Sequence, residues 1–302
     1  MPQRDDNATP NLSPGQRLRD AVVAETPLQV PGVINAYCAL LAERAGFNAL
    51  YLSGAGVANA SFGWPDLGYT TLESVAEDAR RVTQATALPL LVDADTGFDD
   101  PGETANAFID AGVAGMHLED QVEQKRCGHR PGKQLVPPGV MCERVRAAVD
   151  ARKDPAFVVM ARTDAHAVEG LDAAIERAIA YVEAGADMIF AEALATLDEF
   201  RRFVDAVKVP VLANITEFGK TPGFTVDELR SAGVSLALYP LTAFRAMSFA
   251  ATQAYTTLRN DGTQRALLDR MQTREQLYDV LRYHEHEQRL DTQLKQEGAN
   301  DG

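Results

Sequence analysis

AGVAGMHLED, residues 111–120, decides the fold, because it joins the end of a helix to a short apolar run. The same arrangement recurs at AGFNALYLSG (residues 45–54), AGADMIFAEA (184–193) and AGVSLALYP (232–240). A glycine just past a helix supplies the left-handed backbone that closes it. The apolar run that follows is then a buried strand. The repeated phrase therefore predicts helices that alternate with buried strands.

Short apolar runs of this kind occur along most of the chain. We predict strands at Val33–Ala36, Ala49–Ser53, Leu88–Ala94, Gly115–Glu119, Phe157–Ala161, Met188–Glu192, Val209–Ile215 and Leu236–Tyr239. Parallel strands that alternate with helices favour a (β/α)₈ TIM-type barrel, with an open doubly wound sheet as the alternative.

Helical periodicity fills most segments between these runs. In residues 169–185 the apolar stripe is Leu171, Ile175, Ile179 and Val182. Three capping boxes of the form Thr-x-x-Glu mark helix starts, at Thr70/Glu73, Thr196/Glu199 and Thr225/Glu228.

The domain organisation follows from where this rhythm stops. Residues 1–14 are a polar N-terminus that we expect to be disordered, residues 15–260 form the barrel, and residues 261–302 form a helical extension with a polar tail. One helix of about a dozen residues would finish a barrel. The surplus helix needs an apolar surface to cover, and a neighbouring subunit offers one.

Composition excludes several classes of protein. The formal net charge is −14, from 29 basic and 43 acidic residues, which argues against nucleic-acid binding. No apolar stretch of about 18 residues could span a membrane, and the N-terminus shows no secretory signal. Three cysteines without a Cys-x-x-Cys pair argue against a disulfide framework and fit a cytoplasmic protein.

Acidic side chains stand at the ends of two neighbouring strands. Asp93 and Asp95 are two apart on one predicted strand, which would point both the same way, and Glu119 ends the next strand. Hard oxygen ligands suit Mg²⁺ or Mn²⁺. The alternative is that these acids cap the following helices.

A basic segment follows the fourth predicted strand. Lys125-Arg126-Cys127-Gly128-His129-Arg130 gathers cations around a thiol, and nearby cations favour a thiolate. The alternative is a solvated loop with an inert cysteine. Arg162, at the end of the fifth strand, can grip a substrate carboxylate or form a structural ion pair with Asp164, Glu192 or Glu119.

Five of these stretches together resemble the isocitrate lyase/phosphoenolpyruvate mutase superfamily. They are KRCGHRPGK (125–133), LLVDADTG (90–97), MHLEDQ (116–121), MARTDA (160–165) and NITEF (214–218), and the resemblance runs from about Gly15 to about Leu290. It implies a Mg²⁺-dependent carbon–carbon lyase that cleaves 2-methylisocitrate to pyruvate and succinate in the methylcitrate cycle of propionate catabolism. It also implies a homotetramer in which the last barrel helix is swapped onto a neighbouring subunit.

The resemblance also implies roles for particular residues. Asp93 and Asp95 would bind the metal, with Asp66 and Glu119 near it. Cys127 would be the general acid, Arg162 would act in catalysis, and Tyr51 is the candidate base from its place at a strand end. Substrate contacts carry over to Ser53, Gly54, Ala55, Cys127, Gly128, Arg162, Glu192, Asn214, Ile215, Thr216, Arg245 and Arg274.

Two departures from the family pattern bear on the substrate. Ala55 stands where relatives have glycine, and its methyl group is harmless only if its φ is negative. Phe190-Ala191-Glu192 stands where methylisocitrate lyases tend to have Phe-Pro-Glu, so Ala191 is the second departure. Isocitrate lyases carry tryptophan at the position of Phe190, and the smaller ring favours a substrate with an extra methyl group. The alternatives are a lyase for isocitrate, 2,3-dimethylmalate or oxaloacetate, and a non-catalytic oligomeric paralogue.

Overall fold

The computed structural model describes residues 12–122 and 132–300, with side chains as far as residue 294. The chain forms two compact units, Met1–Arg245 and Ala246–Gly302. The division falls inside one continuous helix, α11 (Thr242–Asp261), rather than at residue 260 where the sequence places the end of the barrel. Helix α1 begins at Pro14 after the capping residue Ser13, so helix starts inside the predicted disordered tail.

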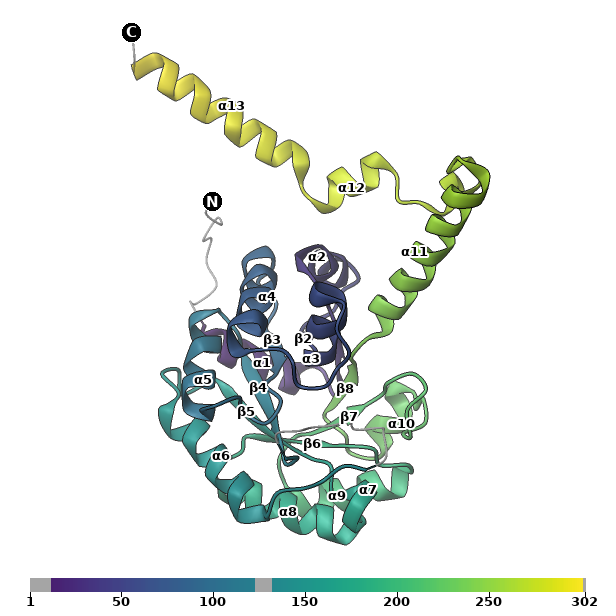
Figure 1. Cartoon of the computed structure of the whole chain (residues 1–302). Coiled ribbons are helices and arrows are strands. Elements are labelled where there is room, and N and C mark those ends of the chain that lie inside the picture. Colours follow the sequence, from purple (N-terminus) through teal and green to yellow (C-terminus); the bar gives the residue numbers. More distant parts are fainter. Residues whose placement is uncertain (1–11, 123–131, 301–302) are drawn as a thin grey trace. The chain divides into compact units, whose positions relative to one another are not determined.

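The first unit is a barrel of eight parallel strands surrounded by helices (Figure 1). The strands are β1 (Leu28–Pro31), β2 (Leu50–Leu52), β3 (Leu90–Asp93), β4 (Gly115–Glu119), β5 (Val158–Thr163), β6 (Met188–Ala191), β7 (Val211–Asn214) and β8 (Leu236–Tyr239). Each strand pairs with its neighbours in sequence, and β1 pairs with β8. A parallel bridge between Gly32 and Tyr51 joins β1 to β2 and completes the ring.

Gly32 is required by this closure. A β-carbon added there would lie 1.8 Å from the carbonyl oxygen of Pro240, just past β8. Only glycine lets the two chain segments approach so closely.

The first predicted strand is wrong in position. Strand β1 is Leu28–Pro31, and Val33–Ala36 instead leads into helix α2 (Ala36–Arg44), whose N-cap is Asn35. The LQVP run ends in proline, which cannot donate a hydrogen bond to a neighbouring strand and therefore normally argues against a strand. For this reason the sequence pattern does not indicate β1. The other seven predicted strands overlap the observed ones.

The helices of the barrel unit lie between and outside the strands. They are α1 (Pro14–Ala24), α2, α3 (Gly54–Gly56), η1 (Val57–Ser61), α4 (Leu72–Ala85), α5 (Pro101–Asp110), α6 (Pro138–Ala151), α7 (His166–Glu169), α8 (Leu171–Glu183), α9 (Leu197–Val207) and α10 (Val226–Ser231). Capping boxes start α9 and α10 as predicted. The Thr70/Glu73 box is wrong: Thr71 caps α4, and the Ser74 hydroxyl takes the place of a carboxylate.

Two clusters of apolar side chains form the core. The larger packs between strands and helices, and the smaller fills the barrel interior with alternate strand residues such as Tyr51, Met160 and Phe190. Helix α1 contributes Leu18 to the interior cluster. Successive residues of a strand point alternately into the two clusters, so the strands are apolar along their length. Polar groups are found instead at the carboxyl ends of the strands.

Helix α8 buries a different face from the one that the sequence predicts. Its fully buried face is Ala174, Arg177, Ala178 and Tyr181, whereas the predicted stripe is only partly buried and Ile179 is exposed. Small residues let α8 lie close to the sheet, and Tyr181 and Arg177 carry polar groups inward.

The second unit consists of helices. It holds most of α11, the 3₁₀ segment η2 (Arg265–Arg270), α12 (Arg274–Val280) and α13 (Tyr283–Asn300). Phe249 and Tyr255 are exposed on α11. Within the described part of the chain, no helix combines the length and apolarity that crossing a membrane requires.

Candidate active site

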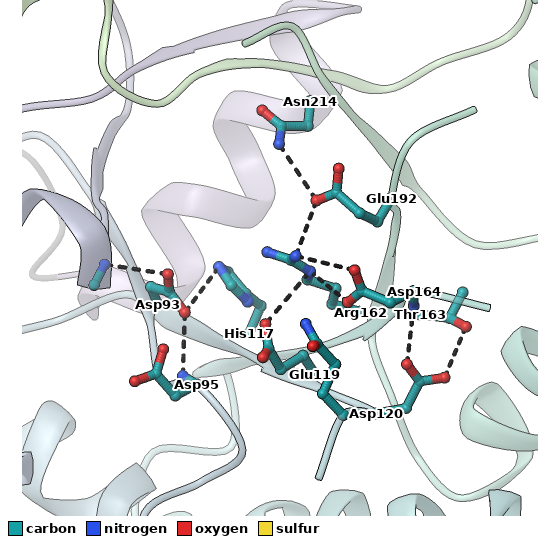
Figure 2. A network of polar contacts seen from close by, with 12 residues as sticks. Asp93, Asp95, His117, Glu119, Asp120, Arg162, Thr163, Asp164, Glu192 and Asn214 are labelled. Carbon is teal, nitrogen blue, oxygen red and sulfur yellow. Dashed lines mark hydrogen bonds and ion pairs between the residues drawn. The ribbon is translucent and has the colours of Figure 1, made fainter. Parts of the chain in front are cut away.

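Polar and charged side chains converge at the carboxyl ends of β3 to β7, in two adjoining groups (Figure 2). One group is built around Asp93 and Asp95, and the other around Arg162. Because barrel strands run in parallel, their carboxyl ends meet at one rim, where barrel enzymes have their active sites.

Asp93 and Asp95 flank one small space. Asp93 accepts hydrogen bonds from the Gly54 N–H at Oδ2 and from the Asp95 N–H at Oδ1, each at 3.1 Å. Strand β3 ends at Asp93, and Asp95 lies beyond it with φ +51°. The two aspartates are therefore not on one strand as the sequence predicts, and a left-handed backbone at Asp95 positions its side chain.

Gly54 shows that the two carboxylates share that space. A β-carbon added at Gly54 would lie 3.2 Å both from Asp93 Oδ2 and from Asp95 Oδ1. The neighbouring Ala55 lies in the helical turn α3 and is not among the described residues with positive φ, so its methyl group causes no backbone strain. An added side chain would press on the two carboxylates at Gly54.

The donor set fits a hard divalent cation held through few protein ligands. Both carboxylates are almost fully buried, with exposed fractions of 6% and 8%. In residues 12–122 and 132–294, no group of three or more Asp, Glu, His or Cys side chains is placed to hold a metal alone. Mg²⁺ typically keeps several waters and binds one or two carboxylates plus a substrate, so this pair is suited to it.

Tyr51 and His117 lie beside the aspartate pair. The Tyr51 hydroxyl is 2.9 Å from His117 Nε2 and 3.5 Å from Asp93 Oδ2. The two rings are stacked, with centroids 5.8 Å apart, and the rings of His117 and Phe190 make a T-shaped contact with centroids 5.1 Å apart. The candidate base is thus held between a histidine and a carboxylate of the aspartate pair.

Arg162 is the centre of the second group. Its Nε and Nη2 atoms donate to the two oxygens of Asp164 at 3.0 and 3.2 Å, and Nη2 also lies 3.2 Å from Glu192 Oε2. Glu119 Oε2 lies 3.6 Å from Nε. The Nε and Nη2 side of the guanidinium is therefore paired with Asp164. Among the described residues, none of these ion pairs with carboxylates involves Nη1.

The charge of Arg162 is firmly fixed. Burial opposes the charged guanidinium, but the attraction of the three carboxylates outweighs it and holds the pKa well above the ordinary value. The Phe190 ring covers the guanidinium, with 4.9 Å between Cζ and the ring centroid. Both alternatives from the sequence thus remain: the ion pairs are present, and Nη1 can still meet a substrate carboxylate.

A second layer holds Asp164. Its N–H donates to Asp120 Oδ1 at 2.9 Å, and Thr163 and Tyr181 donate to Asp120 Oδ2 at 2.8 and 2.9 Å. Burial raises the pKa of the Asp120 carboxyl, with these hydrogen bonds acting in the opposite direction. Arg177 lies 3.6 Å from Asp120 Oδ2. Strand β5 is therefore anchored at the point where it carries Arg162.

The remaining predicted site residues lie as follows. Ser53 and Ile215 are buried, Thr216 and Asp66 are partly buried, and Asn214 donates to Glu192 Oε2 at 3.3 Å. Arg245 faces the loop after β7, 3.6 Å from Glu217. Arg274 begins α12 in the second unit, and Cys127 and Gly128 lie outside the described residues.

Three further residues belong to the site although no sequence pattern assigns them a role. His117 and Asp120 lie in the MHLEDQ stretch, and Lys133 ends KRCGHRPGK. All three are buried. Lysine and aspartate are rarely buried without a partner. Burial can be predicted from the sequence only within a strand or helix whose apolar periodicity is recognisable, and Lys133 lies in no such segment.

The fold and this rim define a (β/α)₈-barrel enzyme of small anionic substrates. A family model described as phosphoenolpyruvate phosphomutase matches residues 18–259. A 2-methylisocitrate lyase of Escherichia coli (strain K12) is 59% identical over 283 residues, which are 92% of this chain and 96% of that one. The chain belongs to the isocitrate lyase/phosphoenolpyruvate mutase superfamily, and within it to the family of 2-methylisocitrate lyases, which are carbon–carbon lyases.

Solved structures agree in fold. A crystal structure of 2,3-dimethylmalate lyase has a TM-score of 0.86 and 34% identity, covering 94% of this chain and 96% of that chain. A phosphonopyruvate hydrolase in complex with oxalate and Mg²⁺ has a TM-score of 0.80 and 27% identity, covering 91% and 97%. The family match confirms the barrel that the sequence predicts.

Proposed function

We propose that this chain cleaves 2-methylisocitrate into pyruvate and succinate with Mg²⁺, and that Mn²⁺ can substitute. The observation that carries the proposal is the pairing of an aspartate group with an arginine group on one barrel rim. The 59% identity to a 2-methylisocitrate lyase supports the substrate, and the Mg²⁺ complex of a structural neighbour supports the metal.

Asp93 and Asp95 would hold the metal, with Glu119 and Asp66 near it. When bound, Mg²⁺ would offset the negative charge of the substrate alkoxide and of the emerging keto acid. The Gly54 N–H keeps Asp93 oriented toward this space. Tyr51, whose hydroxyl oxygen lies 3.5 Å from Asp93 Oδ2, would act in its deprotonated form as the base that removes the substrate hydroxyl proton.

The remaining residues would bind and protonate the fragments. Arg162 through Nη1, together with Asn214, Ile215 and Thr216, would bind carboxylates. Breaking the carbon–carbon bond releases pyruvate and leaves an electron pair on the succinate carbon. The Cys127 thiol would donate the proton that neutralises it, since its basic neighbours in the sequence favour the thiolate that remains.

We also infer a cytoplasmic homotetramer that acts in the methylcitrate cycle. Exposed apolar side chains on α11, such as Phe249 and Tyr255, support burial against a neighbouring subunit. Sedimentation analysis of the purified chain tests the assembly.

The decisive experiment is product identification by proton NMR. Purified protein with Mg²⁺ is mixed with 2-methylisocitrate and, separately, with isocitrate, 2,3-dimethylmalate and oxaloacetate. Pyruvate and succinate formed from the first, and abolished by a chelator, are the expected result. If another acid is turned over faster, that acid is the substrate and the proposal of 2-methylisocitrate is wrong. If none of the acids is turned over, the result favours a non-catalytic paralogue. Cys127→Ser, run in parallel, should lose about a hundredfold or more in rate.

A further inference from the structure

Lys133 is a buried lysine that the proposed chemistry leaves unused. Its side chain is only 2% exposed, and its Nζ lies 2.7 Å from Oδ1 of Asp164, whose side chain is fully buried. Lysine is among the residues least often buried, because removing an ammonium from water is costly unless a charge partner compensates. Such burial indicates a specific role for the pair.

Asp164 connects this lysine to Arg162. The same Oδ1 atom accepts from Lys133 Nζ and from Arg162 Nη2, while Oδ2 accepts from Arg162 Nε. The Asp164 N–H is fixed to Asp120. One rigid carboxylate therefore carries two cations, and the position of the guanidinium depends on how that carboxylate is held.

The charges of the group show what Lys133 adds. Glu119, Asp164 and Glu192 bring three negative charges around Arg162, and Lys133 adds a second positive charge to this group. Replacing Lys133 with a neutral residue makes the group more negative by one charge. A substrate that carries several carboxylates would enter beside this group, and an added negative charge there weakens its binding.

We propose that Lys133 is a positioning residue that acts through Asp164 on Arg162 and thereby sets the affinity of the site for a di- or tricarboxylate. The Lys133 ammonium offsets one carboxylate charge, and it fixes Asp164 so that Arg162 Nε and Nη2 stay paired with that carboxylate. The Nη1 group of Arg162 is then left for the substrate. This inference rests on the proposed function for the identity of the substrate, but not for the binding of carboxylates as a class.

The test compares Lys133→Met with the unaltered chain and with Lys153→Met. Lys153 is a matched control, since it pairs with Asp110 at 3.1 Å but is 59% exposed. Succinate is titrated calorimetrically in the presence of Mg²⁺, and kcat and KM are measured with 2-methylisocitrate. Lys133→Met should raise the Kd of succinate and the KM by about tenfold while kcat changes less than about threefold. Lys153→Met should change neither constant.

Folding is monitored by circular dichroism, and Lys133→Gln serves as a second variant that keeps a donor to Asp164 without the charge. It should also weaken succinate binding. A folded Lys133 variant with unaltered Kd and KM overturns the proposal, as does loss of thermal stability alone. If the unaltered chain fails to turn over 2-methylisocitrate, the proposed function falls, but the succinate titration still decides the role of Lys133.

Discussion

The two halves of the rim handle charge in opposite ways. Around Asp93 and Asp95, two buried carboxylates lie near the hydroxyl of Tyr51, and Asp93 accepts hydrogen bonds from the backbone N–H groups of Gly54 and Asp95. Around Arg162, every described carboxylate is paired with a guanidinium or an ammonium. Figure 2 shows the two groups side by side, with His117 between them.

This difference indicates a division of labour. Two buried carboxylates that flank one space, as around Gly54, suit a cation that arrives with the substrate. A closed network of ion pairs gains little stability from its charges, but it fixes geometry, because each partner leaves the other few orientations. The Asp93 and Asp95 half is thus suited to binding a cation, and the Arg162 half is suited to holding the guanidinium donor in a fixed position.

Removing a carboxylate from the first half should have the largest effect. We expect Asp93→Asn to lower kcat/KM by about a thousandfold or more, because Mg²⁺ stabilises developing charge by several kcal/mol. Calorimetric titration with Mg²⁺ should show correspondingly weak binding. An unaltered metal titration would refute Asp93 as a ligand and would remove the contrast between the halves.

Breaking the fork of the second half should cost less. Arg162→Lys retains the positive charge but cannot make two parallel hydrogen bonds to Asp164. We expect kcat/KM to fall about a hundredfold, with Mg²⁺ affinity unchanged. A loss of Mg²⁺ affinity in this variant would show that the two halves are one coupled unit.

The sequence predicted the barrel well because the buried strands are apolar runs that follow helix-closing glycines. It located Asp93, Glu119 and Arg162 because strand ends can be read from those runs. It missed β1, where Pro31 interrupts the pattern, and it gave the wrong reason for Asp95, whose left-handed backbone leaves no mark in the sequence.

The supporting residues could not be predicted for a different reason. Lys133 and Asp164 are 31 positions apart, and Arg177 and Asp120 are brought together only when α8 packs on the sheet. Such pairs depend on tertiary packing, which periodicity does not encode. The apolar stripe predicted for residues 169–185 does not include Arg177.

A methyl group at Gly54 should disturb the first half alone. The added β-carbon of Gly54→Ala would lie 3.2 Å from oxygens of Asp93 and Asp95, so the carboxylates must shift. We expect the Kd of Mg²⁺ to rise about tenfold. Gly56→Ala is the matched control, because its β-carbon would make only ordinary contacts, 3.4 Å from Ser53 Cβ and 3.5 Å from Leu241 Cδ2. Equal effects of both substitutions would contradict the inference that the Asp93 and Asp95 carboxylates share the space beside Gly54.

Phe190 touches both halves, since its ring meets His117 and covers Arg162. We expect Phe190→Trp to lower the ratio of kcat/KM for 2-methylisocitrate to that for isocitrate by about tenfold, because the larger ring takes the space of the methyl group. Phe190→Leu, which avoids overpacking, should leave that ratio nearly unchanged. If the tryptophan variant keeps the original preference, the methyl group is accommodated elsewhere.

The smallest effect should come from the outer edge of the second half. A hydrogen bond from Arg177 lowers the pKa of Glu169, so the pair stabilises the fold above the ordinary glutamate pKa, and the contribution disappears as the pH falls through the lowered value. Glu169 is 37% exposed, so solvent screening limits this contribution to about 0.5 kcal/mol at pH 7. Glu169→Gln should lower the free energy of unfolding by that amount in urea titrations and leave kcat unaltered. The difference should vanish once the pH lies below the lowered pKa of Glu169, because the carboxyl is then neutral in both the folded and the unfolded state. A difference that persists at low pH would have to come from packing, and a change in kcat would extend the positioning network as far as this surface pair.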